Sequence, residues 1–149
     1  MLTKTVGNAV ISPATILASK HVRDGIIGAW DKTQAESCEY GGWIYFSEAS
    51  GEYRTKEKKG QATGIILTPV PDHKDAGYVI VADWHCHPDN GVPGARPSDQ
   101  DIANAKSKDY LMLVVTVKKA PKSGWKQDLL AQTQIVDDTH AKYRVWNIL

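Results

Sequence analysis

Residues 82–105 read ADWHCHPDNGVPGARPSDQDIANA, and this stretch decides the fold expected for the rest of the chain. His85 and His87 end an apolar run that begins at Tyr78, and such a run, rich in β-branched residues, is typical of a β-strand. Side chains two residues apart on a strand point to the same face of the sheet. We therefore expect both imidazoles to project together, while Cys86 points to the opposite face.

Ser98 opens the second half of the stretch as the candidate N-cap of a helix over residues 98–107. Ser98 and Asp101 together resemble a capping box, which on its own favours a structural interpretation. The histidine pair reverses that preference. Two imidazoles and one carboxylate that meet at a point are typical ligands of a catalytic zinc ion, whose fourth position stays open for water. His85, His87 and Asp101 are therefore candidate zinc ligands.

The remaining sequence predicts an α+β fold, in which a mixed β-sheet is flanked by an N-terminal helix and by the helix after the histidines. The N-terminal helix is expected from about Pro13 to Trp30, with Ser12 as its N-cap. The run LMLVVTV at residues 111–117 is expected to be a central strand buried on both faces. The other expected strands are residues 41–46, 52–55, 64–67, 78–86, 127–136 and 142–146.

Composition narrows the class of protein. With 149 residues, 42% of them hydrophobic, the chain is long enough to bury a core, and we expect one domain over residues 1–149. Lys and Arg number 18 against 17 Asp and Glu, so we expect neither nucleic acid nor membrane as a partner. No signal peptide or membrane span is expected, which favours a cytoplasmic protein or one exported by a dedicated secretion system. Cys38 and Cys86 are expected to be free and buried.

The order His85-x-His87-Pro88 followed by Ser98-x-x-Asp101 resembles the JAMM family of zinc metallopeptidases, also called JAB or MPN-plus. The resemblance extends upstream, because Glu39-Tyr40-Gly41-Gly42-Trp43 is similar to the family's glutamate-bearing strand. Among its branches, the chain most resembles a bacterial one known mainly as domains of secreted and polymorphic-toxin proteins. The expected loop of residues 88–97 is longer than in most members, so the substrate surface is not carried over. No long insertion of the kind found in ubiquitin-chain-cutting relatives is visible, so ubiquitin specificity is not carried over either.

The resemblance implies a curved mixed sheet with cytidine-deaminase-like layers and one zinc ion per chain, held by His85, His87 and Asp101. Glu39 would be the general base, and Ser98 would hydrogen-bond the oxyanion. The implied function is a zinc-dependent peptidase or isopeptidase, as the effector domain of a secreted bacterial protein. The implied partners are a protein or peptide substrate and an immunity or inhibitor protein.

Alternatives remain at several positions. Glu36 competes with Glu39 for the role of base, and His21, His73 and His140 are expected to be surface residues. A non-catalytic interaction module of the same fold, or an amidase acting on cell-wall peptides, would also fit the sequence. A nucleobase deaminase is disfavoured because its His-x-Glu and Pro-Cys-x-x-Cys ligands are absent. Four aromatic residues would either line a substrate groove or belong to the core. They are Trp43, Tyr45, Tyr53 and Trp84.

Overall fold

The computed structural model describes residues 3–88, 98–117, 131–137 and 142–147, and these residues contain eight strands and three helices. The strands are β1 (Lys4–Val6), β2 (Ala9–Ile11), β3 (Tyr40–Ser47), β4 (Glu52–Lys59), β5 (Tyr78–Cys86), β6 (Leu111–Val117), β7 (Ala131–Asp137) and β8 (Lys142–Asn147). The helices are α1 (Pro13–Ala18), α2 (Lys20–Glu36) and α3 (Asp99–Lys106). In this part of the chain, no helix is long and apolar enough to cross a membrane.

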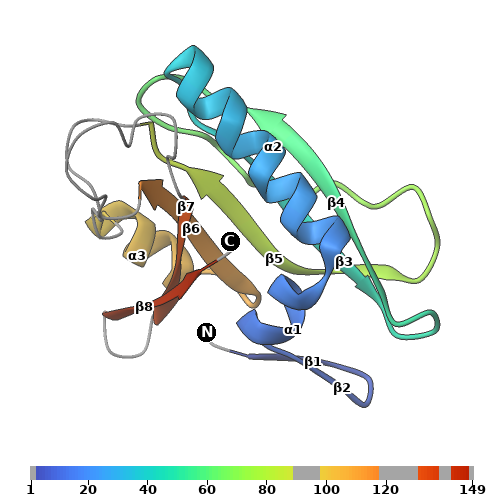
Figure 1. The fold of residues 1–149 in the computed structure, drawn as a ribbon. Helices are drawn as coiled ribbons and strands as arrows, with labels where there is room; N and C mark the ends of the chain where they lie inside the picture. The colour runs from blue at the N-terminus through green and yellow to red at the C-terminus, as the bar shows by residue number, and fades with distance from the viewer. Residues whose placement is uncertain (1–2, 89–97, 118–130, 138–141, 148–149) are drawn as a thin grey trace.

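Six of the strands form one mixed sheet in the order β4-β3-β5-β6-β7-β8, and β1 and β2 form a separate hairpin (Figure 1). The pair β5 and β6 is parallel, and every other pair in the large sheet is antiparallel. Parallel neighbours need a crossover connection, and α3 lies within the connection between β5 and β6. The predicted α+β class with a mixed sheet and two flanking helical regions is confirmed.

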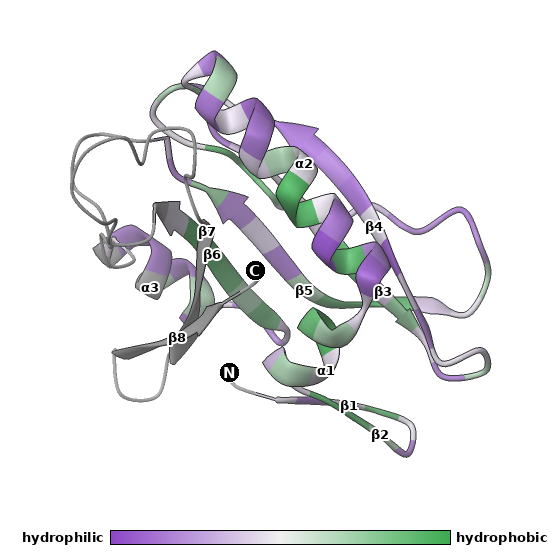
Figure 2. Cartoon of the chain, in the orientation of Figure 1, coloured by the Kyte–Doolittle hydropathy of each residue, from purple (hydrophilic) through white to green (hydrophobic). Residues whose placement is uncertain are grey.

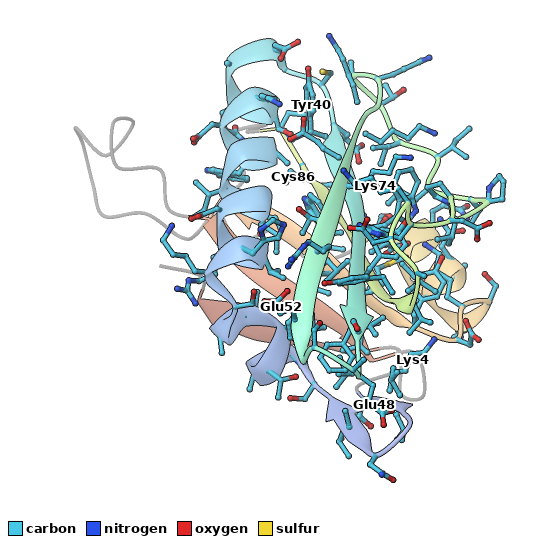
Figure 3. All side chains as sticks on the ribbon, turned by 90° about the vertical axis from the view of Figure 1, so that its right-hand side faces the viewer. Lys4, Tyr40, Glu48, Glu52, Lys74 and Cys86 are labelled. Atoms are coloured by element: carbon cyan, nitrogen blue, oxygen red, sulfur yellow. The ribbon has the colours of Figure 1, made fainter. Side chains whose placement is uncertain are left out.

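The helices cover opposite faces of the sheet. Seen from the side, α2 lies on one face, and α3 and the segment that carries Lys74 lie on the other (Figure 3). The main core fills the α2 side, where Val22, Ile26 and Trp30 pack against apolar residues of β3, β5 and β6. The edge strand β4 is mostly hydrophilic (Figure 2). Hydrophilic side chains on an edge strand disfavour its pairing with a strand of another chain.

Alternation along β5 divides its residues between these two faces. Trp84 and Cys86 belong to the core cluster beneath α2, and both are fully buried. His85 points the other way, toward α3, as the two-residue period of a strand requires. The strand therefore anchors itself in the core with one set of side chains and presents the other set to the opposite face.

Three details of the sequence prediction are wrong. The expected helix from Pro13 to Trp30 is two helices, because Ser19 has an extended backbone and caps α2 through a bond from the backbone N–H of Val22 to Ser19 Oγ. Residues 64–67 form no strand, and only an isolated bridge between Gln61 and Gly64 occurs there. The hairpin of β1 and β2 was not expected. Residues 127–130 of the expected strand 127–136 lie outside the described residues.

Candidate functional site

Strand β5 delivers two histidines to the site. The His85 residue is 5% exposed, and His87 follows just beyond the end of the strand. The backbone of His87 is held on both sides, because its N–H donates to Val115 O at 2.8 Å and its carbonyl accepts from Gln34 Nε2 at 3.2 Å. The two imidazole ring centres are 5.0 Å apart, so the rings face the same space as the spacing predicted.

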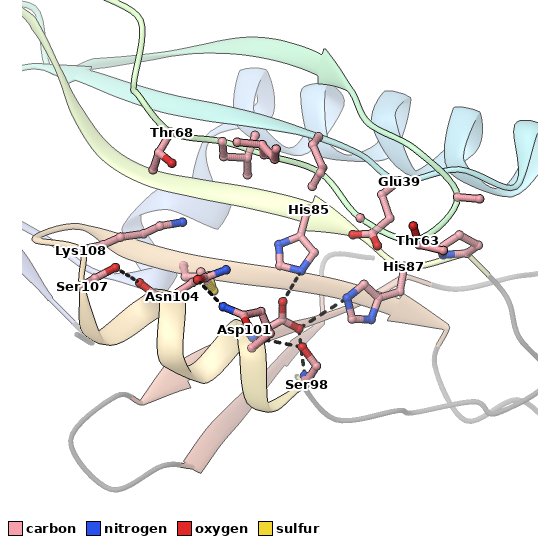
Figure 4. Close-up of a pocket in the computed structure, with 18 residues that line it drawn as sticks. Glu39, Thr63, Thr68, His85, His87, Ser98, Asp101, Asn104, Ser107 and Lys108 are labelled. Carbon is pink, nitrogen blue, oxygen red and sulfur yellow. Dashed lines mark hydrogen bonds and ion pairs between the residues drawn. The ribbon is translucent and has the colours of Figure 1, made fainter.

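The first turn of α3 brings a carboxylate to the histidines. Ser98 and Asp101 form a capping box, in which each residue's backbone N–H donates to the other's side chain. The Asp101 side chain continues from this cap toward β5. Its Oδ1 lies 3.0 Å from His85 Nε2, and its Oδ2 lies 3.5 Å from His87 Nε2. Figure 4 shows Asp101 and Ser98 on one side of the histidines and Glu39 on the other.

Glu39 immediately precedes β3 and is anchored through its backbone to the segment after β4. Its N–H donates to Gln61 O at 2.9 Å, and its carbonyl accepts from Gly60 N–H at 2.7 Å. The ligand atoms of Glu39, His85 and His87 all lie within 4.8 Å of one another. This group has the composition and spacing to hold a metal ion.

Gly41, two residues after Glu39, permits close packing of β3 against β5. Gly41 pairs with His85 in the sheet, and a Cβ built on Gly41 would lie 2.2 Å from Trp84 O. A side chain at this position would therefore push β3 away from β5. The absence of one lets the Glu39 turn approach the histidine strand.

Burial and neighbouring charges shift the pKa values of the titratable groups in the site. Burial disfavours a protonated His85, but the hydrogen bond and charge of Asp101 more than offset it, so the pKa of His85 is raised. Burial and the charge of His85 lower the pKa of His87 to about 4. Burial also acts against an ionised Asp101, but the hydrogen bond and charge of His85 prevail and hold the pKa of Asp101 well below its usual range. Burial raises the pKa of the Glu39 carboxyl.

The four side chains open into a pocket of about 660 Å³. One wall is the extended segment 62–68, and the other is α3 with the residues that follow it (Figure 4). Lys108, two residues after the end of α3, lines the far end and was not predicted. Nothing in the sequence identified residues 62–68 as a wall of the pocket, since their position depends on contacts with side chains of the sheet.

Several other predictions concern residues near the site. Glu36 is exposed and bonds Lys59 Nζ at 2.8 Å and the Tyr40 hydroxyl at 2.7 Å, so it does not enter the pocket. Cys38 and Cys86 are free and buried, as expected. The four aromatic residues belong to the core clusters and do not line the pocket; they are Trp43, Tyr45, Tyr53 and Trp84.

The histidines outside the site differ from one another. His21 is exposed, as expected, and His140 lies outside the described residues. The surface prediction for His73 is wrong, because its side chain is only 9% exposed between the rings of Tyr45 and Tyr78.

Comparison with known proteins gives one match. The family model of prokaryotic homologs of the JAB domain matches residues 11–128, which include every candidate site residue. None of the curated proteins matches the sequence.

Proposed function

The chain belongs to the prokaryotic homologs of the JAB domain, and from this premise we propose that it is a zinc-dependent hydrolase of amide bonds, a peptidase or isopeptidase. The observation that carries the proposal is the meeting of four side chains in one pocket. They are Glu39, His85, His87 and Asp101. Domains of this family are often metal-dependent hydrolases.

The distances support His85, His87 and Asp101 as the ligands. Zinc binds imidazole nitrogen and carboxylate oxygen at about 2.0–2.2 Å in tetrahedral geometry, which separates neighbouring ligand atoms by about 3.3–3.5 Å. The Asp101 oxygens lie 3.0 and 3.5 Å from the two Nε2 atoms. Glu39 lies on the other side of the histidines from Asp101, and we assign it the role of general base rather than ligand. Three protein ligands of this kind would leave a fourth position of a tetrahedral zinc ion for water.

A bound zinc ion would lower the pKa of a coordinated water and polarise the scissile carbonyl. Glu39 would accept the proton of the attacking water and pass it to the leaving amine, and burial assists this role by raising the pKa of its carboxyl. The Ser98 oxygen already accepts the Asp101 N–H, which leaves the hydroxyl hydrogen available to donate to the developing oxyanion.

The shape of the pocket supports a peptide substrate. Its 62–68 wall is not paired into the large sheet. Side chains of the sheet hold two carbonyls of this wall and one carbonyl shortly after it. Lys58 Nζ donates to Ile66 O, Trp43 Nε1 to Leu67 O, and the Tyr45 hydroxyl to Pro71 O. This preformed rim, with Ile66 71% exposed on it, suits an extended chain laid along the groove.

Metal content tests the proposal first. Protein purified without chelators should contain about one zinc ion per chain by mass spectrometry, His85→Ala should lose it, and His21→Ala, which changes an exposed histidine, should keep it. The wild type should then cleave peptide or isopeptide substrates, and a chelator should stop the reaction. Absence of zinc after zinc is supplied would contradict the proposal and favour a non-catalytic interaction module.

We also propose an effector role, which the resemblance to domains of secreted and toxin proteins supports. Production of the chain inside bacteria should then slow growth, while Glu39→Gln at equal protein level should not. Equal growth of the wild-type and Glu39→Gln cultures would contradict the effector role without contradicting the hydrolase proposal. An immunity or inhibitor protein would be sought only after a toxic effect is seen.

A further inference from the structure

A buried ion pair lies beside the candidate metal centre. Lys108 Nζ is 2.5 Å from Asp83 Oδ2; the Asp83 side chain is fully buried, and that of Lys108 is 9% exposed. Lys108 follows α3 and lines the end of the pocket away from Glu39 (Figure 4). Nothing in the proposed chemistry uses either residue.

The pair joins the same two elements that carry the candidate ligands. Asp83 lies two residues before His85 on β5, so both side chains project from one face of the strand. Lys108 lies two residues after the end of α3, and its side chain returns to the same strand to meet Asp83. Strand and helix are therefore connected twice, by Asp101 to the histidines at one end and by Lys108 to Asp83 at the other.

Among the described side chains, one small apolar cluster connects α3 to the sheet. The helix has eight residues, and among the described side chains its buried apolar contact with the sheet is Ala105 against Met112 and Val114. Polar contacts of Asp101 with the histidines and of Lys108 with Asp83 add to this packing and fix the position of the helix relative to β5.

Stability is a weak explanation for the pair. Removing two charges from water costs free energy that their attraction often fails to recover. Here Asp83 Oδ1 has no hydrogen-bond partner among the described residues, so the carboxylate is only half satisfied. A geometric role explains better why a charged pair stands at this position.

We propose that Asp83 and Lys108 are positioning residues, which fix α3 against β5 and so hold the Asp101 carboxylate beside the His85 and His87 imidazoles at the separation that a zinc ion needs. The inference rests on the proposed function only in that it takes these three residues as ligands. It assigns no contact with substrate to Lys108.

The test measures zinc affinity in full-length protein by competition with a chromophoric chelator. Asp83→Leu/Lys108→Met removes both charges and leaves no unpaired ion, so it is the variant most suited to fold. Asp109→Leu/Lys106→Met makes the same changes at exposed neighbouring positions and is the matched control. Thermal unfolding checks that both variants fold.

We expect zinc to bind about 10- to 100-fold more weakly in Asp83→Leu/Lys108→Met, the range found when groups that orient metal ligands are removed. The zinc affinity of the control should stay within about twofold of that of the wild type, a change smaller than the 10- to 100-fold range. Cobalt bound in place of zinc should also show a changed visible spectrum in the first variant only. Lys108→Arg, which keeps the charge pair, should recover most of the affinity.

The outcomes separate this inference from the proposed function. Unchanged zinc affinity in folded Asp83→Leu/Lys108→Met would overturn the positioning role even if the wild type is an active peptidase. Unchanged affinity with a raised KM would overturn it too and would assign Lys108 to substrate binding. Weaker zinc binding in the variant of a chain that cleaves no peptide would uphold the positioning role and reject the catalytic proposal.

Discussion

Ser98 and Asp101 bind each other reciprocally at the start of α3. The Ser98 N–H donates to Asp101 Oδ2 at 2.9 Å, and the Asp101 N–H donates to Ser98 Oγ at 3.0 Å. The same Asp101 carboxylate reaches both imidazoles. A helix cap and a candidate metal ligand are therefore one structural device, and the two interpretations of these residues are not alternatives.

Ser98→Ala is expected to lower both stability and catalysis. Loss of a serine N-cap costs about 1 kcal/mol of unfolding free energy. Loss of an oxyanion donor costs about 10²–10³ in kcat. Urea unfolding and steady-state kinetics measure the two effects separately.

Ser12→Ala is the matched control for that variant. Ser12 caps α1 in a capping box with Thr15, far from the pocket lining. This variant should lose a similar stability, about 1 kcal/mol, and keep its kcat. If both variants lost activity equally, the effect of Ser98 would be that of a helix cap alone.

Glu39→Gln should abolish hydrolysis and retain zinc. The amide keeps the size of the side chain but cannot accept a proton, and removal of a general base typically lowers rates by about 10²–10⁴. Glu36→Gln is the control, because Glu36 bonds Lys59 and Tyr40 outside the pocket. Zinc content and peptide cleavage, measured on the same samples, would contradict the assignment if Glu39→Gln remained active or lost its metal.

Zinc affinity should fall as the pH is lowered, by about tenfold per pH unit below the pKa of His85. In the metal-free protein the Asp101 carboxylate raises that pKa, so His85 keeps its proton to a higher pH than a free imidazole, and zinc must displace the proton wherever it is bound. His87, with a pKa of about 4, is already neutral and releases no further proton. Below the pKa of His85, the logarithm of the zinc dissociation constant should therefore change with pH with a slope of about one.

A slope of two would contradict this assignment of charges, because both histidines would then release protons. His21→Gln, which removes an exposed histidine, should give the same slope as the wild type.

Local pattern predicted the parts of the fold that local physics determines. The alternation in β5 fixed the common face of His85 and His87, and the capping residue Ser98 fixed where α3 begins. The helix break at Ser19 was missed because Pro13 to Trp30 keeps a helical stripe through it, while the serine side chain caps a second helix instead.

Features that depend on distant segments could not be predicted in this way. Residues 64–67, in the wall of the pocket, read as a strand in isolation, but their neighbours are side chains of the sheet rather than a paired strand. The ion pair of Asp83 and Lys108 joins residues 25 apart in sequence, and neither carries a motif. Contacts of this kind depend on how the segment between β5 and β6 folds back onto the sheet, which no periodicity encodes.

Gly41→Ala should destabilise the protein and weaken its zinc binding together. The added Cβ would lie 2.2 Å from Trp84 O and 2.9 Å from His85 Cα, and because both are backbone atoms of β5 they cannot turn aside. Relief requires β3 and β5 to separate at the pair of Gly41 and His85, at a cost of about 1–3 kcal/mol.

Gly28→Ala is the opposite case and the control. A Cβ at Gly28, inside α2, meets no atom within 4 Å, so alanine adds helix propensity without a clash and should raise the unfolding free energy by about 1 kcal/mol. Urea unfolding of the metal-free variants should therefore give changes of opposite sign. A Gly41→Ala protein as stable as the wild type would mean that β3 and β5 are not held this closely, and the approach of Glu39 to the histidines would then need another cause.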